Sequence, residues 1–516
     1  MGATPKPAHC GFVAPAARPW HRMGRAWSRS SAVLLFLCAG GIAVVHYTLA
    51  SPRILRPVRS VVASTAPTLL EPTATSSCEV CLLEPTNPLC RYGLVNIRLS
   101  RAYEGSGHRL RKVLRKALAG EEVGIGGLGA SVTAGHAVPP GEQRWEDRFF
   151  EDFQRYFPNA RMHVGAAPAM DSQFFVYCAA AMIPVDLDIY LIELDINNDM
   201  SINTVQSDDA LMRSLLNQPQ EPAVIRISVL TLMFDELVQG ASSGLITSQF
   251  FDVPVISLRG FMLPYLIQHR EKAPEGFGID YLGAIDYRHI SAPVHRTLGD
   301  MLSLFVQKEI CETRRQAALD TSALPLARGL WLEDGDLGRV PNLTLWSSWL
   351  RPAEPRQITP LCQSLGSPRS PFAPLSHSKT FEIEEWNGKT AWMASLPGSQ
   401  IRMNFTGSRL GLFVYISNGR NPQESSDDLA VRRRHAPGSA TCWIEDAVTG
   451  KDDEAAAREI DMFEIDTYLP SRGASGFDFV ELAEDLAAGE HILACEVSST
   501  SQSGGYRWRL QGIASY

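Results

Sequence analysis

The sequence predicts an α/β domain with a parallel sheet, followed by an antiparallel β-sandwich and preceded by one membrane-spanning helix. The parallel sheet is predicted by unbroken apolar runs at residues 188–194, 223–230 and 253–258, which alternate with helical patterns. The sandwich is predicted by short alternating segments, separated by Gly-, Asn- and Ser-rich turns, after residue 376. At 516 residues the chain is long enough for two such domains and their connectors.

The membrane helix is predicted by residues 32–50, an apolar run in which His46 is the only group that titrates near neutral pH. At 1.5 Å per residue this run just spans a hydrocarbon core of about 30 Å. Five basic residues precede it and three follow, which favours a cytoplasmic amino terminus and a body in the secretory pathway. A signal peptide cleaved near Ala50 and a mitochondrial presequence are the alternatives. The N-glycosylation sequons at Asn342 and Asn404 agree with the secretory pathway.

Composition predicts the remaining boundaries. Residues 1–31 are expected to form a cytoplasmic tail, and residues 51–100, rich in Pro, Ser, Thr and Ala, a luminal stem. The α/β domain is expected over residues 101–312 and the β-sandwich over residues 376–516. A connector rich in Pro, Arg and Ser is expected between them, at residues 313–375.

The net charge of −8 is unevenly distributed along the chain. The first 70 residues contain eight Lys or Arg and no acidic residue, so the rest of the chain carries −16. Nucleic-acid binding needs a basic face, so this acidic body argues against a nucleic-acid partner.

Eight cysteines follow the apolar run, and an even number in an oxidising compartment predicts up to four disulfides. The pairing of Cys442 with Cys495 is favoured because both lie in the last segment. Cys78 and Cys81 have the spacing of a zinc half-site or a redox motif. Since no second half-site is found, a disulfide of the stem is favoured for them.

Local patterns predict the other elements. Residues 122–125 predict a first strand that ends in a glycine turn at residues 126–129. Helical periodicity predicts four helices, at residues 108–118, 145–156, 209–216 and 294–305. Alternating polarity predicts five strands in the sandwich, at residues 381–386, 400–405, 410–416, 461–468 and 491–497.

The first candidate site is Ser131, in the sequence Gly-Ala-Ser-Val-Thr-Ala-Gly of residues 129–135. It follows a predicted strand, and open parallel sheets bind ligands beyond the carboxyl ends of their strands. Flanking small residues can expose the hydroxyl, although the same residues also fit a structural turn.

Two more candidates lie later in the α/β domain, Asn197 after a predicted strand and the Asp286–His289 pair on a predicted loop. Asn197 comes directly after residues 188–194, where its side-chain amide can donate to a developing oxyanion. Asp286 lies three residues before His289, so its carboxylate can fix the imidazole tautomer and stabilise the imidazolium. Each pattern alone also fits an ordinary polar loop. His295 is an alternative base, but it is expected to begin a helix.

Together these signals, over about residues 120–305, resemble the SGNH (GDSL-type) hydrolase superfamily. The resemblance implies a three-layer, flavodoxin-like α/β fold. It implies that Ser131 is the nucleophile, that Asp286 and His289 are its catalytic pair, and that Asn197 donates to the oxyanion.

The resemblance also assigns the other two oxyanion donors, the amides of Ser131 and of Ala169; a shifted alignment would give Gly165 in place of Ala169. The chain departs from the family's Gly-Asp-Ser at Ala130 and from its Asn-Asp at Asn198. The Gly-x-Ser-Val-Thr-Ala-Gly motif is similar to that of fungal and algal secretory members. The last segment resembles galactose-binding-like jelly rolls.

The implied activity is hydrolysis of O-acyl esters, chiefly O-acetyl esters on glycans, through an acyl-enzyme without metal or cofactor. A polysaccharide O-acetyltransferase would use the same residues, and a catalytically inactive glycan-binding protein is the other alternative. Trp386, Trp392 and Trp443 fit either sugar stacking or a sandwich core. The expected partners are an O-acylated glycan or small ester and, through residues 32–50, a membrane; the sequence does not indicate an oligomeric state.

Overall fold

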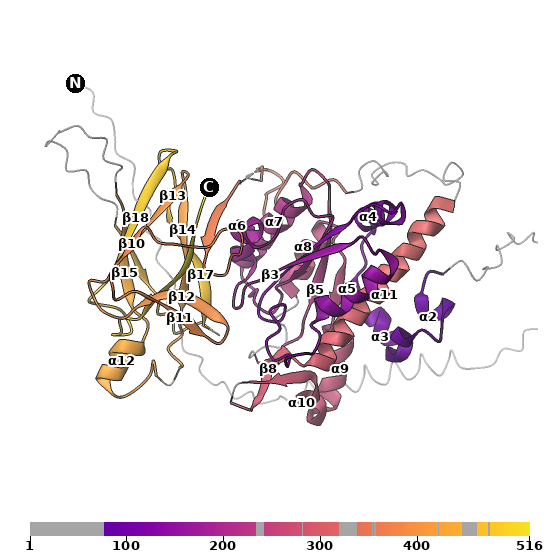
Figure 1. Ribbon diagram of the computed structural model, residues 1–516, viewed down its shortest axis with the longest axis horizontal. Coiled ribbons are helices and arrows are strands. Elements are labelled where there is room, and N and C mark those ends of the chain that lie inside the picture. Colours follow the sequence, from indigo (N-terminus) through magenta and orange to yellow (C-terminus); the bar gives the residue numbers. More distant parts are fainter. Residues whose placement is uncertain are drawn as a thin grey trace, which may run out of the picture. The chain divides into compact units, whose positions relative to one another are not determined.

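A computed structural model describes most of the chain after residue 76 (Figure 1). The described ranges are 77–233, 242–280, 282–318, 338–352, 354–355, 358–421, 423–445, 462–472 and 475–516. Within these ranges no helix has both the length and the apolar character needed to cross a bilayer. The predicted tail, the membrane helix at residues 32–50 and the first part of the stem lie outside the described residues.

The first domain is built on a six-stranded sheet in the order β1-β6-β5-β4-β2-β3. Its strands are β1 (Arg101–Tyr103), β2 (Gly124–Gly129), β3 (Arg161–Ala166), β4 (Ile189–Glu193), β5 (Ala223–Ser228) and β6 (Val255–Ser257). Strands β2 to β6 are parallel and have the 2-1-3-4-5 order of flavodoxin-like sheets. The predicted parallel sheet is therefore confirmed, with one addition: β1 pairs antiparallel at the edge.

Strand β2 contains the glycines that were expected to form a turn. A Cβ on Gly126 would lie 2.6 Å from Ile183 and 2.7 Å from Leu187, so only glycine lets these side chains pack directly on the strand. The expected turn at residues 126–129 is wrong because close packing, rather than a change of direction, uses these glycines. The chain turns only after Gly129, at the segment that carries Ser131.

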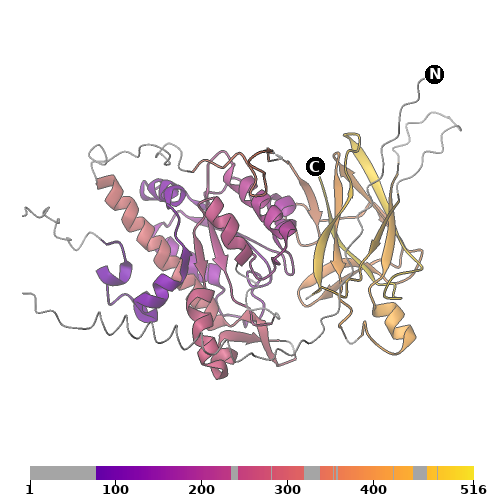
Figure 2. The ribbon, with the colours of Figure 1, turned by 180° about the vertical axis from the view of Figure 1, so that it is seen from behind.

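Helices cover both faces of the sheet (Figure 2). One layer contains α4 (His108–Leu118), α5 (Trp145–Tyr156) and α11 (Ala292–Ala318), and the other contains α6 (Ser172–Met182), α7 (Ile202–Leu216) and α8 (Ser242–Phe250). Ile189 belongs to the hydrophobic core under α4, α5 and α11, and the next residue, Tyr190, to the core under α6 and α7. Successive strand residues point to opposite faces, so the domain has three layers. After β6 follow α9 (Arg259–Gln268), α10 (Ala273–Gly276) and the hairpin of β7 (Phe277–Ile279) and β8 (Ile285–Ile290).

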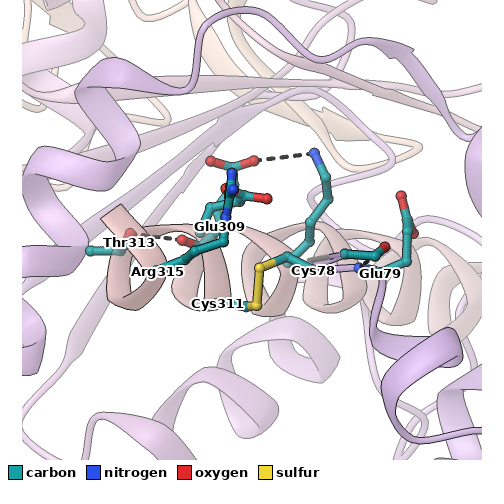
Figure 3. The surroundings of a disulfide bond; sticks show 9 residues. Cys78, Glu79, Glu309, Cys311, Thr313 and Arg315 are labelled. Carbon is teal, nitrogen blue, oxygen red and sulfur yellow. Dashed lines mark hydrogen bonds and ion pairs between the residues drawn. A yellow bond between two sulfur atoms is a disulfide. The ribbon is translucent and has the colours of Figure 1, made fainter. Parts of the chain in front are cut away.

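The second half of the predicted stem is folded onto the α/β domain. Residues 77–100 form the short helices α2 (Val80–Leu83), η1 (Pro88–Tyr92) and α3 (Leu94–Leu99), and Leu89 and Ile97 are buried in the domain core. Cys78 is joined to Cys311 on α11, as Figure 3 shows, and Cys81 is joined to Cys90. Each cysteine of the Cys-x-x-Cys sequence thus has its own disulfide partner, which leaves no thiol for a zinc half-site or a redox pair.

The second domain is a β-sandwich of two antiparallel sheets, in the orders β10-β13-β18-β15-β16 and β11-β12-β19-β14-β17, with β9 paired to β19. Its elements are β9 (Leu361–Ser364), β10 (Ser376–His377), β11 (Glu382–Trp386), β12 (Lys389–Ala394), β13 (Gln400–Thr406), β14 (Leu410–Ile416), α12 (Leu429–His435), β15 (Ser439–Glu445), β16 (Met462–Asp466), β17 (Gly476–Ala483), β18 (Glu490–Val497) and β19 (Trp508–Ser515). Because β9 belongs to this domain and α11 extends to Ala318, the predicted connector at residues 313–375 is too long at both ends. Cys442 and Cys495, the pair favoured from the sequence, are joined across neighbouring strands.

Helix α6 contacts the parallel sheet and the sandwich at the same time. The ring of Phe174 lies 5.0 Å from that of Phe413, and the ring of Tyr177 stacks on Phe479 at 4.3 Å. A disulfide joins Cys178 on this helix to β9 of the sandwich. The two domains therefore share an apolar interface and a covalent bond next to the carboxyl end of the parallel sheet.

Candidate active site

The three side chains predicted to be catalytic form one hydrogen-bonded chain. Ser131 lies in the turn after β2, and Asp286 and His289 lie on β8. The Oγ of Ser131 is 2.8 Å from Nε2 of His289, and Nδ1 of His289 is 2.5 Å from Oδ2 of Asp286. A histidine between a hydroxyl and a carboxylate can take the hydroxyl proton while the carboxylate fixes its tautomer.

The carboxylate of Asp286 is held in its ionised form. Burial alone would raise the pKa of Asp286, but the hydrogen bond and charge of His289 and the backbone N–H of Arg288, at 3.0 Å, lower that pKa below its usual value. An ionised Asp286 stabilises the imidazolium that forms when His289 accepts a proton.

Neither of the two other histidines near the site contacts Ser131 in this way. His295 lies in α11, where its Nδ1 accepts the backbone N–H of Trp145 at 3.2 Å, and burial lowers its pKa to about 3. It is a neutral histidine of the core, so the alternative base is not supported. His136, which the sequence did not single out, lies with its ring centroid 5.2 Å from that of His289, and burial lowers its pKa to about 4.

Two backbone amides are free to bind an oxyanion. Among the described residues, no hydrogen bond is donated by the N–H of Ser131 or of Ala169. Ala169 has a φ of 66°, a left-handed conformation that is uncommon for a residue other than glycine, and it lines the same cavity as Ser131. Gly165 lies within β3, where a Cβ would be 2.7 Å from Met182. Gly165 therefore has a packing role, and the alignment with Ala169 is preferred.

The two asparagines after β4 have different surroundings. Asn198 is buried; its Oδ1 accepts the backbone N–H of Ser172 at 3.0 Å and its Nδ2 donates to the Ser172 hydroxyl at 2.8 Å. Asn197 is half-buried and lines the cavity, and its side chain has no hydrogen bond within the described part of the chain. Asn197 is thus available to a ligand, whereas Asn198 holds the loop.

These surroundings predict opposite effects for the two asparagines. Asn197→Ala should lower kcat of an ester-hydrolysing site by about 10²- to 10³-fold with little change in stability, because one oxyanion donor is lost. Asn198→Ala should instead lower the free energy of unfolding by about 1–3 kcal/mol, since Ser172 loses two buried hydrogen bonds. Steady-state kinetics and denaturant unfolding of the two variants check this. If the two variants lost the same amount of activity and the same amount of stability, the different roles of Asn197 and Asn198 would be contradicted.

A buried polar network holds the loop that follows β4 and carries Asn197. The Ser172 hydroxyl donates to Asp208 at 3.0 Å, and the guanidinium of Arg226 donates to Asp208 at 2.5 Å and to Asp195 at 2.8 Å. Arg226 and Asp195 are fully buried. Because Asp195 is two residues before Asn197, the network fixes the backbone that presents Asn197 to the cavity.

Glu193 connects the end of β4 to the turn that carries Ser131. Its Oε2 accepts the Thr133 hydroxyl at 3.0 Å and the Thr133 backbone N–H at 3.3 Å. Burial raises the pKa of Glu193 to about 8, so the side chain is largely protonated at neutral pH.

The raised pKa of Glu193 makes stability depend on pH. The native state holds this proton more tightly than the unfolded state, so its contribution is complete below about pH 4.5 and is lost as the pH rises toward 8. Glu193→Gln removes the titration and keeps an acceptor for Thr133. We expect the melting temperature of this variant, relative to the unmodified protein, to increase with pH over that range. The exposed Glu121→Gln serves as control, and a difference that does not vary with pH would contradict the prediction.

The catalytic chain opens into a cavity of about 590 Å³ that both domains line. The α/β domain contributes Ser131, His136, Ala169, Asn197 and His289. The sandwich contributes Lys389, Leu469, Arg472, Ser475, Gly476 and Asp478. The size is that of a typical small-ligand site, and its polar lining suits a hydroxyl-rich ligand.

The sandwich tryptophans do not all face this cavity. Trp386 packs against Tyr415 at 5.2 Å and Phe477 at 6.1 Å between ring centroids, with the Arg509 guanidinium 4.7 Å above it. It thus belongs to the core near the domain interface. Trp392 and Trp443 are half-buried in the sandwich, and none of the three lines the cavity.

Comparison of the sequence with protein-family models and with curated proteins finds no match. Comparison of the structure gives matches that cover both domains. The crystal structure of a two-domain esterase active on acetylated mannans aligns with a TM-score of 0.52 at 16% identity, over 81% of this chain and 98% of the esterase. The two chains share one two-domain fold. The esterase crystallised with mannopentaose aligns with a TM-score of 0.51 at 16% identity, over 81% of this chain and 97% of that one.

Proposed function

We propose that this protein is a serine esterase of the SGNH type that removes O-acyl groups, chiefly acetyl groups, from a glycan. One observation carries the proposal: the hydrogen-bonded chain of Ser131, His289 and Asp286 opens into a cavity that also contains Ala169 and Asn197. The fold shared with a two-domain esterase active on acetylated mannans is in line with this activity. Hydrogen bonds among all three catalytic groups argue against the catalytically inactive alternative.

In the first half of the reaction, His289 takes the proton of Ser131 as Oγ attacks the carbonyl carbon of the ester. The amides of Ser131 and Ala169 and the side chain of Asn197 donate to the oxyanion that forms. The intermediate collapses by breaking the bond to the sugar oxygen, which receives the proton from His289. The products are the free sugar hydroxyl and an acyl-Ser131 ester.

In the second half, water replaces the sugar in the cavity. His289 takes a proton from the water, and the hydroxide oxygen attacks the acyl-Ser131 carbonyl. Breakdown of the second tetrahedral intermediate returns the proton to Ser131 Oγ and releases the carboxylic acid. Asp286 remains ionised throughout and stabilises the imidazolium in each half.

A fluorophosphonate probe tests the proposal directly, because it reacts covalently only with an activated serine. We expect the full chain to be labelled and to release acetate from acetylated mannan, and the Ser131→Ala variant to show neither property. Absence of labelling in a folded unmodified chain would overturn the assignment of Ser131. Labelling without acetate release from any acetylated glycan would support Ser131 as the nucleophile but overturn the proposal that the substrate is a glycan.

We also propose that the protein works in the secretory pathway or outside the cell, held by residues 32–50 or released near Ala50. Four disulfides among the described residues suit an oxidising compartment, and both sequon asparagines, Asn342 and Asn404, are exposed. Treatment of the cell-derived protein with an N-glycosidase should lower its apparent mass. An unchanged mass together with reduced cysteines would contradict this location.

A further inference from the structure

A hairpin of the sandwich places Lys389 beside the catalytic histidine. Strands β11 and β12 are joined by the two-residue turn Asn387–Gly388, whose φ values of 47° and 70° are those of a tight hairpin turn. A Cβ on Gly388 would collide with Nε2 of His136, so the tip of the hairpin touches the turn that also carries Ser131. Lys389 follows directly and lines the cavity.

Within the described part of the chain, no acidic group pairs with the ammonium group of Lys389. The residue is half-buried, and among the described residues it has no hydrogen bond and no ion pair. The charges that act on it most are those of Arg288, which also lines the cavity, and Arg509. Burial and these two cations lower the pKa of Lys389 to about 8, which leaves it mostly charged at neutral pH. Arg509 itself is bound to Glu384 at 3.0 Å.

The acidic groups of the cavity have other partners. Asp478 forms an ion pair with Arg472, and Asp199 accepts a hydrogen bond from the N-terminal cap of α7. Asp171 caps α6, and burial raises its pKa to about 7. None of these three is hydrogen-bonded to Lys389, so none of them neutralises its ammonium group. A partly desolvated cation without a partner is costly unless an anion binds to it.

We propose that Lys389, with Arg288 alongside, binds the carboxylate of an acidic sugar in the acylated glycan, next to the ester that Ser131 attacks. The inference rests on the proposed function and narrows its substrate class to glycans that contain uronic acids. Lys389 is then a specificity-determining residue that the second domain supplies to the active site.

The test compares two substrates that differ only at C6, monoacetylated methyl glucuronoside with a carboxylate there and monoacetylated methyl glucoside with a hydroxymethyl group, the acetyl group being on the same ring hydroxyl in both. We expect kcat/KM of the unmodified full chain to be higher for the glucuronoside by about tenfold or more, the effect of one hydrogen bond to a charged group. Lys389→Met should bring the ratio of the two values close to one, and Lys389→Arg should preserve the preference. Lys379→Met, the same change at an exposed lysine of the sandwich, is the matched control and should leave the ratio unchanged.

Equal kcat/KM for the two substrates, in a chain that the fluorophosphonate labels, would overturn the inference and leave the esterase intact. A chain that hydrolyses neither substrate would count against the esterase. In that case, calorimetric titration of Ser131→Ala with methyl glucuronoside and with methyl glucoside would still measure binding at Lys389. Equal dissociation constants for the two glycosides would overturn the inference. Tighter binding of the glucoside 6-sulfate than of the glucuronoside would overturn the choice of a carboxylate.

Discussion

Ser131→Ala is expected to lower kcat by roughly 10⁴- to 10⁶-fold, and adding His289→Ala to that variant should lower it little further. The two residues act on one proton: the 2.8 Å hydrogen bond between them is the path by which Oγ becomes a nucleophile. Once the hydroxyl is absent, the imidazole has nothing to activate. The residual rate would come from the oxyanion donors and from substrate binding alone.

Kinetics on an acetylated glycan and thermal unfolding of the two single variants and the double variant check this expectation. All three should fold, because neither substitution removes a large part of the core. His163→Ala, a change of the same kind at an exposed position of β3, should keep full activity. Independent, multiplicative losses from Ser131→Ala and His289→Ala would contradict a shared proton transfer.

Arg226→Met is expected to lower the free energy of unfolding by about 3–5 kcal/mol. The guanidinium is fully buried between Asp195 and Asp208, and its removal leaves two buried carboxylates without their counter-charge. Methionine keeps the unbranched apolar part of the side chain, so the loss reports mainly the missing guanidinium with its charge and hydrogen bonds. Since Asp195 belongs to the loop of Asn197, kcat should fall as well.

Denaturant unfolding of Arg226→Met against Arg161→Met separates this effect from a general loss of a salt bridge. Arg161 pairs with Glu122 at 3.2 Å, but its side chain is 70% exposed, and such pairs contribute about 0–1 kcal/mol. Similar losses for the two variants would show that the buried network contributes no more than a surface pair.

Strands made almost entirely of buried apolar residues could be predicted from the sequence. Strands that are very short, or that mix polar and apolar residues without alternation, could not. The apolar runs of β4, β5 and β6 result from burial on both faces of a parallel sheet, which leaves a direct mark on composition. Strand β1 has only three residues, too few for any periodicity. Strand β19 is buried along its whole length between β12 and β14, so its mixture of polar and apolar residues lacks the alternation of a half-exposed strand.

The active site also has one part that the sequence predicts and one part that it does not. Ser131 and Asn197 follow strands of the six-stranded sheet, and Asp286 and His289 lie three residues apart on β8, in the separate β7–β8 hairpin. Their local patterns are enough to suggest their roles. The wall made by Lys389 and Arg472 comes from residues more than 250 positions after Ser131. No local pattern encodes that approach, because it depends on the packing of α6 against the sandwich.

The Cys178–Cys362 bond determines what happens when the main chain is cut. The other disulfides of the described residues each join cysteines within one domain or its N-terminal extension. A single backbone break anywhere between residues 318 and 361 would therefore leave one covalent particle, with the cavity wall still attached. On a gel the broken chain would run as one band until a thiol reductant separated it into two fragments.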